Sequence, residues 1–391
     1  MSNAFEHIPG AAILQVVPAL DTGGAERTTI DVARAIVAAG GRAIVASRGG
    51  RMVAELEDAG ARHVEMSVHS KNPVVMALNV ERLTRLIARE KIGLVHARSR
   101  APAWSALAAA RRAKIRFVTT YHSRVHEKPR LKVFYNSVMT RGDAVIANSE
   151  FTAGRIRAVH KPEEARIFTV PRGIDIDGLA PGAVAPGRIE ALCARWEIDG
   201  TTGVIFLHPA RLTRWKGQSV SVEAARLLRA RGIGGFTLLL AGDAQGRDNY
   251  VDELRRAIAA GGIEAELRIV GHCDDMAAAY ALSDVVLSPS IEAEPFGRTA
   301  VEGQAAARPV IVSDAGGQRE TVLTGDEAAT GMCVPPGDAA ALADAMAQAI
   351  SLGPEARAAM GARGRAHVAA HYSVAAMCAT TLGIYDRLLA R

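Results

Sequence analysis

The chain has 391 residues, 49% apolar and 23% charged, so it is long enough for two domains that each bury a full core. Its four cysteines form no Cys-x-x-Cys pair, which argues against a disulfide framework or a thiolate metal site and favours a reduced, cytoplasmic compartment. The net charge is +6, and aromatic residues make up only 4% of the chain, too few for the base-stacking platforms of a nucleic-acid-binding protein.

The N-terminal residues 1–20 contain an apolar run that is too short to span a bilayer and lack a basic n-region. Neither a signal peptide nor a transmembrane helix is therefore expected. Beyond this segment, short apolar runs alternate with helical segments along the whole chain. In the first half the runs predict strands at 12–18, 42–47, 62–68, 93–99, 116–123, 144–150 and 167–173.

The same alternation begins again in the second half, where strands are predicted at 204–210, 236–242, 267–271, 284–290, 309–317 and 332–337. Alternating strands and helices indicate parallel sheets that are covered by helices on both faces. The fold class is therefore α/β, with two doubly wound, Rossmann-like domains.

The boundary between the domains is expected in the Gly- and Pro-rich segment 171–188. The predicted domains are residues 1–172 and 173–373, and a final helix over 374–391 is expected to pack back on the first domain. Ligands of such two-lobed proteins bind in a cleft at the carboxyl ends of the strands.

The sequence "LDTGGAERTT" follows the first strand and opens a helix. Gly23 and Gly24 allow a ligand to approach the backbone, and the N–H groups of a helix start favour an anion. The motif is neither a Walker loop nor a G-x-G-x-x-G fingerprint, and a simple tight turn is an equally good interpretation.

His122 stands at the end of the strand predicted over 116–123, where a lone histidine is more often structural than catalytic. His126 follows at a spacing of four, and His367 and His371 repeat that spacing. Neither pair has the glutamate of H-E-x-x-H or an evident third ligand, so no metal site is predicted.

The motif "PARLTRWKGQ" follows the first strand of the second half. Its Arg211 and Lys216 stand five residues apart in a loop before a helix, so both could reach one diphosphate. The alternative is a solvated basic turn.

The segment "EAEPFGRTAVEGQAA" comes after the strand predicted over 284–290. Pro295 and Gly297 break its start, which places Glu294 on a loop at the mouth of a helix and Glu302 inside that helix. Such carboxylates accept hydrogen bonds from sugar hydroxyls, while the N–H groups of the turn face phosphate. A pair of glycosidase carboxylates is the competing interpretation, but a nucleotide-sugar site also explains Arg211 and Lys216.

The pattern S-x-x-x-E-P-F-G-x-x-x-x-E, with "ARPVIVSDAGGQRE" and "GMCVPPGD" after it, resembles the retaining glycosyltransferases with the GT-B fold. That family includes bacterial transferases that build lipopolysaccharide, exopolysaccharide and glycolipids. The resemblance extends over nearly the whole chain, from "GGAER" through "VPRGIDID", "RLTRWKG" and "LLAGDAQG" to the two glutamates.

The resemblance implies a role for each matching residue. Gly23 and Gly24 would line the donor phosphate and the acceptor side, and His122 would lie beside the transferred sugar. On the donor side, the implied contacts are diphosphate with Arg211 and Lys216, sugar hydroxyls with Glu294, backbone contacts from Phe296 and Gly297, phosphate with the N–H groups of Arg298 and Thr299, and ribose hydroxyls with Glu302. No metal and no other cofactor is expected.

The resemblance thus implies a retaining, metal-independent transferase that uses a nucleotide sugar. The alternatives are a nucleotide-sugar epimerase on the same fold or a non-catalytic sugar-nucleotide-binding protein. A solute-binding protein would need an export signal, and a nicotinamide-dependent oxidoreductase would need the missing phosphate fingerprint.

Charge is unevenly distributed, with 27 Lys and Arg against 15 Asp and Glu in residues 1–172 and 20 against 26 in the remainder. The basic excess is concentrated in residues 98–141, on the half that the resemblance assigns to the acceptor. A solvated face is the simpler interpretation. The hypothesis here is an anionic, lipid-linked saccharide acceptor, plausibly lipopolysaccharide core, met by a cytoplasmic enzyme that binds the inner membrane peripherally. Nucleic acid is not an expected partner.

Overall fold

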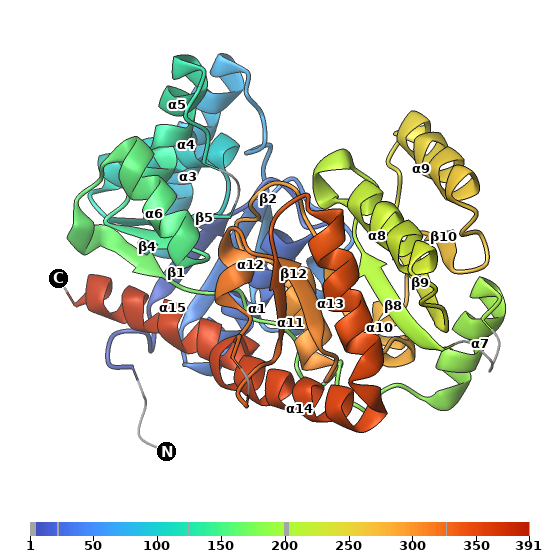
Figure 1. Ribbon diagram of the computed structural model, residues 1–391. Helices are drawn as coiled ribbons and strands as arrows, with labels where there is room; N and C mark the ends of the chain where they lie inside the picture. Colours follow the sequence, from blue (N-terminus) through green and yellow to red (C-terminus); the bar gives the residue numbers. More distant parts are fainter. Residues whose placement is uncertain (1–4, 22, 123–124, 199–202, 326, 391) are drawn as a thin grey trace. The chain divides into compact units, whose positions relative to one another are not determined.

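The computed structural model describes residues 5–21, 23–122, 125–198, 203–325 and 327–390 (Figure 1). The chain divides into two compact units. Unit 1 comprises residues 1–173 together with 374–391, and unit 2 comprises residues 174–373. Each unit contains one parallel sheet with helices on both faces, as the sequence predicts.

The sheet of unit 1 has seven strands in the order β3-β2-β1-β4-β5-β6-β7. The strands are β1 (Ala12–Val16), β2 (Arg42–Ser47), β3 (Arg62–Glu65), β4 (Ile92–Ala97), β5 (Arg116–Tyr121), β6 (Ala144–Ala147) and β7 (Ile167–Thr169). All pairs are parallel, and β1 pairs with both β2 and β4.

Two cores lie on opposite faces of this sheet because successive strand residues point to opposite sides. Leu14 of β1 belongs to the core under α3 and α4, whereas Ile13 belongs to the core under α1 and α15. The helices are α1 (Gly24–Ala38), α2 (Val53–Asp58), α3 (Pro73–Glu90), α4 (Arg100–Ala113), α5 (Arg130–Asn136), α6 (Glu150–His160) and α15 (Val374–Leu389), with 3₁₀ turns at Ser137–Thr140 and Glu164–Arg166.

The C-terminal helix α15 packs on unit 1, although it follows unit 2 in the sequence. Tyr385 of α15 is fully buried, and its hydroxyl forms a hydrogen bond with Nδ1 of His96 on β4. Nε of Arg116 on β5 donates to the carbonyl oxygen of Leu388 at 3.2 Å. The helix therefore completes one face of the sheet.

The sheet of unit 2 has six parallel strands in the order β10-β9-β8-β11-β12-β13. The strands are β8 (Val204–Pro209), β9 (Phe236–Ala241), β10 (Leu267–Gly271), β11 (Val285–Ser288), β12 (Val310–Ser313) and β13 (Gly331–Val334). The helices are α7 (Pro186–Trp196), η3 (Arg214–Lys216), α8 (Gln218–Ala230), α9 (Asp248–Gly261), α10 (Met276–Leu282), α11 (Arg298–Ala305), α12 (Gly317–Glu320), α13 (Ala339–Ser351) and α14 (Gly353–His371).

All thirteen predicted strands are confirmed, but several are shorter than the apolar runs that predict them. The run 309–317 forms a strand only to Ser313, because the chain turns at Asp314 and Ala315 and then adopts φ 70° at Gly316. Among the described residues, no helix has the length and apolarity to cross a bilayer.

The strand order reverses between β1 and β4 in unit 1, and between β8 and β11 in unit 2. Loops that leave the carboxyl ends of two such strands diverge to opposite faces of the sheet and open a crevice between them. Ligand sites are therefore expected at the two reversal points.

Candidate functional site

The reversal point of unit 2 brings together the two charged motifs that the sequence singles out. Arg211 and Lys216 lie on the segment after β8, and Glu294 lies on the loop after β11. These two strands are neighbours in the sheet, with Val285 opposite Phe206. Residues 78 positions apart in the sequence thus come into contact.

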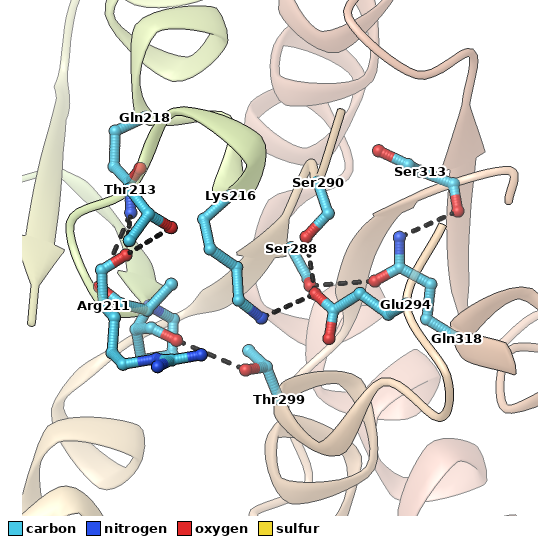
Figure 2. A network of polar contacts seen from close by, with 12 residues as sticks. Arg211, Thr213, Lys216, Gln218, Ser288, Ser290, Glu294, Thr299, Ser313 and Gln318 are labelled. Atoms are coloured by element: carbon cyan, nitrogen blue, oxygen red, sulfur yellow. Dashed lines mark hydrogen bonds and ion pairs between the residues drawn. The ribbon is translucent and has the colours of Figure 1, made fainter. Parts of the chain in front are cut away.

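The central contact is an ion pair between Lys216 and Glu294, with Nζ donating to Oε1 at 2.8 Å (Figure 2). The side chains are only 13% and 9% exposed. Ser290 Oγ donates to the same carboxylate oxygen. The Lys216 ammonium also lies 4.4 Å from the centroid of the Trp215 ring. Several contacts thus hold the pair in place before a ligand arrives.

Backbone contacts explain why the two loops approach so closely. Gly217 has φ 82°, and a Cβ placed there would lie 2.0 Å from the carbonyl oxygen of Pro289. The N–H of Ile291 donates to the carbonyl oxygen of Trp215 at 2.8 Å. A glycine beside the lysine is therefore needed both for its conformation and for the space it leaves.

Helix α11 begins directly beside Glu294. Its N-cap, Gly297, has φ 92° and provides no side-chain cap, and a Cβ there would lie 2.2 Å from Cβ of Gln318. Arg298 and Thr299 form the first turn, and the Thr299 hydroxyl donates to the carbonyl oxygen of Pro209 at 3.3 Å. A helix start without a side-chain cap presents N–H groups to an anion.

Two adjacent glycines in the loop after β12, Gly316 and Gly317, fix the Glu294 backbone. Glu294 forms an isolated parallel bridge with Gly316, and the N–H of Gly317 donates to the Glu294 carbonyl oxygen at 2.8 Å. Cβ atoms at these glycines would lie 2.4 Å from the oxygen of Glu294 and 2.5 Å from that of Pro295. The loop after β12 therefore fixes the backbone of Glu294, and with it the position of the carboxylate.

Phe296 and Glu302 face away from this pair. The Phe296 ring is buried and lies 5.9 Å from that of Tyr372, so only its backbone can meet a ligand in the predicted way. Glu302 lies within α11, where it accepts hydrogen bonds from Nε of Arg298 at 2.6 Å and from the Tyr280 hydroxyl at 2.8 Å. A ribose would have to compete with these two partners.

The two predicted diphosphate ligands have different surroundings. The Arg211 side chain is exposed and has no ion-pair partner among the described residues, whereas its carbonyl oxygen accepts from Nε2 of Gln218 at 3.0 Å. In Figure 2 the Lys216 side chain extends toward Glu294 and the Arg211 side chain toward Thr299. The backbone of Arg211 is thus fixed while its guanidinium can reorient.

At the reversal point of unit 1, a pocket of about 340 Å³ lies at the ends of β1, β4 and β5. Its lining includes His122, Lys71, Arg98, Arg100, Glu26 and Tyr135. Gly24 opens α1, and Gly23 precedes it at φ 149°. The two glycines are not in the lining, but the next residues, Ala25 and Glu26, are.

His122 lies in the wall of this pocket, one residue beyond β5. Both of its ring nitrogens are buried and have no hydrogen-bond partner among the described residues. Burial, followed by repulsion from Arg172 and Arg98, holds the pKa of His122 well below its usual range. The ring is therefore neutral at neutral pH, so one nitrogen can donate a hydrogen bond to a ligand and the other can accept one.

Among the described residues, no group of three His, Cys, Asp or Glu is arranged to hold a metal ion. His367 and His371 do lie close, with ring centroids 5.1 Å apart on α14. Among the described residues, no further His, Cys, Asp or Glu completes a metal site with them.

Two family descriptions match the chain: "Glycosyl transferases group 1" over residues 196–367 and "Glycosyltransferase Family 4" over residues 22–177. The crystal structure of a glycosyltransferase from Rickettsia africae is 35% identical, with a TM-score of 0.88 over 97% of this chain and 99% of that one. This chain belongs to the GT-B glycosyltransferases.

More distant GT-B structures share the fold. The Anabaena protein HepE, crystallised with UDP-glucose, is 23% identical and has a TM-score of 0.79, covering 95% of this chain and 99% of that one. A D-inositol 3-phosphate glycosyltransferase from Kineococcus radiotolerans is 30% identical over 261 residues, which cover 64% of this chain and 58% of that protein. The match thus spans little more than half the length of this curated relative.

In this glycosyltransferase, sequence reasoning did not single out several residues that shape the two sites. Gln318 lies under Gly297 and donates from Nε2 to the Ser313 carbonyl oxygen at 3.1 Å. Tyr280 pairs with Glu302, and Lys71 enters the pocket of unit 1. Ser290 is the serine of the S-x-x-x-E pattern, so its spacing from Glu294 was the one available signal.

Proposed function

We propose that this protein transfers a sugar from a nucleotide-sugar donor to an acceptor hydroxyl with retention of anomeric configuration. The supporting observation is the buried Lys216–Glu294 pair beside the uncapped start of α11. A cation and helix N–H groups suit a diphosphate, while a carboxylate next to them suits sugar hydroxyls.

In the proposed reaction, the bond between the anomeric carbon and the phosphate oxygen breaks and leaves negative charge on the diphosphate. Lys216, Arg211 and the N–H groups of Arg298 and Thr299 stabilise that charge. Lys216 then exchanges part of its bond to Glu294 for the phosphate, which releases a carboxylate oxygen for the sugar. Glu302 takes the ribose, and Phe296 and Gly297 contribute backbone contacts.

The acceptor oxygen forms its bond on the same face of the sugar, and its proton passes to the departing phosphate oxygen. Unit 1 takes the acceptor, with His122 beside the transferred sugar and Gly23 and Gly24 on the phosphate side. The fixed cations of unit 2 provide the counter-charge that a metal ion would otherwise supply, so the reaction proceeds without metal or another cofactor.

For the acceptor, we propose an anionic, lipid-linked saccharide of the cell envelope, such as lipopolysaccharide core. The basic excess of residues 98–141 supports an anionic partner. The name of the Kineococcus relative also specifies a phosphate-bearing substrate. The enzyme would act in the cytoplasm while bound peripherally to the inner membrane.

The test is incubation with a panel of nucleotide sugars, beginning with UDP-glucose because HepE binds it. Release of nucleoside diphosphate that depends on an added acceptor, and a product with the donor's anomeric configuration by proton NMR, are expected. Activity should persist in excess EDTA. Donor interconversion without acceptor would indicate an epimerase, and binding without release would indicate a non-catalytic protein. Inversion or metal-reversible loss would overturn the mechanism.

A further inference from the structure

The pocket of unit 1 has a chemistry that the donor site does not explain. Its lining contains three cations, contributed by different parts of the fold: Lys71 before α3, Arg98 after β4, and Arg100 at the start of α4. We propose that this pocket binds a phosphate group carried by the acceptor. The proposal rests on the proposed transferase function, because it names the substrate class of the acceptor side.

Among these cations, Arg98 gives the strongest indication of a bound anion. Its side chain is 2% exposed, its Nε donates to Oε1 of Gln15 at 2.6 Å, and its Nη2 has no hydrogen-bond partner among the described residues. No ion pair within the described part of the chain joins Arg98 to a carboxylate, and Asp31 lies 3.8 Å from Arg34. Burial lowers the pKa of the Arg98 guanidinium, and the nearby Tyr385, Cys378 and Asp31 oppose that shift. A bound anion beside Nη2 would offset more of the cost of burying this charge.

Two helix starts add to this positive potential. Ala25 and Glu26 of the lining belong to the first turn of α1, and Arg100 and Ala101 belong to that of α4. Ser99, the N-cap of α4, provides no side-chain cap, and neither does Gly23 for α1. These helices have 14 and 15 residues, so both direct a full dipole at the pocket.

The remaining lining groups suit saccharide hydroxyls, where the acceptor would meet the transferred sugar. The ring nitrogens of His122 are buried without partners among the described residues, and a neutral imidazole can donate to one oxygen and accept from another. Glu26 is the single carboxylate among the described lining residues and can accept a hydroxyl hydrogen.

The phosphate could belong to a soluble saccharide phosphate or to a lipid headgroup. Tyr135 and Met139 connect the pocket to α5 and the turn after it. On the same helix, Leu131 and Phe134 are 83% and 61% exposed. The test therefore includes one arm for each source.

Binding is measured by thermal shift and phosphorus NMR with glycerol 3-phosphate, against glycerol and against chloride at equal ionic strength. The background is Lys216→Ala, which weakens anion binding in unit 2. Stabilisation by glycerol 3-phosphate alone is expected. Lys71→Ala and Arg100→Ala should each weaken binding about tenfold or more, as expected for loss of a charge-assisted hydrogen bond. Arg82→Ala, at an exposed arginine of α3 outside the lining, should have no effect.

Equal binding of glycerol 3-phosphate in the background variant and in the two pocket variants would overturn the proposal. So would stabilisation that glycerol or chloride reproduces. In the second arm, vesicles containing phosphatidylglycerol are added; competition with glycerol 3-phosphate supports a headgroup source, and absence of competition supports a soluble one. Nucleoside-diphosphate release by the wild-type protein is measured separately, so a failure of the transferase function is distinguishable from a failure of this pocket.

Discussion

At the scale of single residues, the Lys216–Glu294 ion pair is the central contact of the proposed donor site. Lys216→Ala removes a cation that would stabilise the leaving diphosphate, and Glu294→Gln removes the charge that would hold the sugar. We expect each variant to lower kcat/KM by about 10²–10³, the usual effect of losing one stabiliser of developing charge. Steady-state turnover with the identified donor is the measurement.

Matched controls are available within the same two loops. Arg214 lies in η3 with Lys216 but pairs with Glu253, and Glu292 is exposed two residues before Glu294. Arg214→Ala and Glu292→Gln should retain nearly full turnover. Circular dichroism spectra should be unchanged in all four variants, although loss of one buried partner leaves the other charge uncompensated and lowers stability. Near-normal turnover in both site variants would refute the site assignment.

At the scale of elements, the start of α11 depends on Gly297. Gly297→Ala places a side chain at φ 92°, and its Cβ would lie 2.2 Å from Cβ of Gln318. A strained backbone conformation of this kind costs roughly 1–3 kcal/mol before any clash. We expect a loss of more than about 2 kcal/mol in the free energy of unfolding by urea denaturation.

The control is Gly232→Ala at the end of α8. Gly232 has φ 73°, and no atom lies within 4 Å of its hypothetical Cβ. This variant reports the cost of the backbone conformation alone. If both variants lose the same stability, the contact with Gln318 does not constrain the loop.

Helix α5 carries the surface that we expect to meet the membrane. Leu131 and Phe134 are exposed, and Lys128, Arg130 and Lys132 flank them. An apolar insertion ringed by cations suits an anionic bilayer, where each basic residue contributes about 1 kcal/mol. Wild-type protein should therefore sediment with phosphatidylglycerol vesicles at low salt and dissociate at high salt.

The double variant Leu131→Ser/Phe134→Ser should lose most of this vesicle binding with only a small fall in Tm. Both side chains are largely exposed, although Phe134 lies 5.7 Å from the Trp104 ring. Leu323→Ser, at an exposed leucine of unit 2, is the matched control and should bind as the wild type does. Vesicle binding that does not depend on lipid charge or salt would show that residues 98–141 form a solvated surface without a role at the membrane.

At the scale of the whole molecule, buried and partly buried histidines make stability depend on pH. Burial lowers the pKa of His63, His96, His122, His160, His208 and His367, and that of His208 falls to about 3. The unfolded chain, with histidine pKa values near 6.5, binds more protons below that pH. Stability is therefore fully present above about pH 6.5 and is lost as the pH falls toward the folded values, by at most about 1.4 kcal/mol per pH unit for each histidine.

Urea denaturation between pH 8 and pH 4 measures this loss. His208→Asn removes one titrating group, whose Nδ1 lies 3.0 Å from the Ser221 hydroxyl. The variant should show a shallower decline than the wild type between pH 6 and pH 4. An unchanged slope would mean that His208 is protonated in the folded protein.

The sequence by itself determined the elements and their class. Alternating apolar runs predicted all thirteen strands, because strands buried on both faces of a parallel sheet must be continuously apolar. Turn residues such as Pro295 and Gly297 likewise placed Glu294 before α11 and Glu302 within it. These inferences depend on neighbours along the chain, which the sequence displays directly.

Only the tertiary structure decided which charged groups meet. The contact of Lys216 with Glu294 spans 78 positions, and that of His96 with Tyr385 spans 289. The same is true of the pocket that joins Lys71, Arg98 and His122 at the ends of separate strands. Such contacts follow from strand order and from glycines that let loops approach. Neither leaves a periodic signal in the sequence, because each depends on partners far away along the chain.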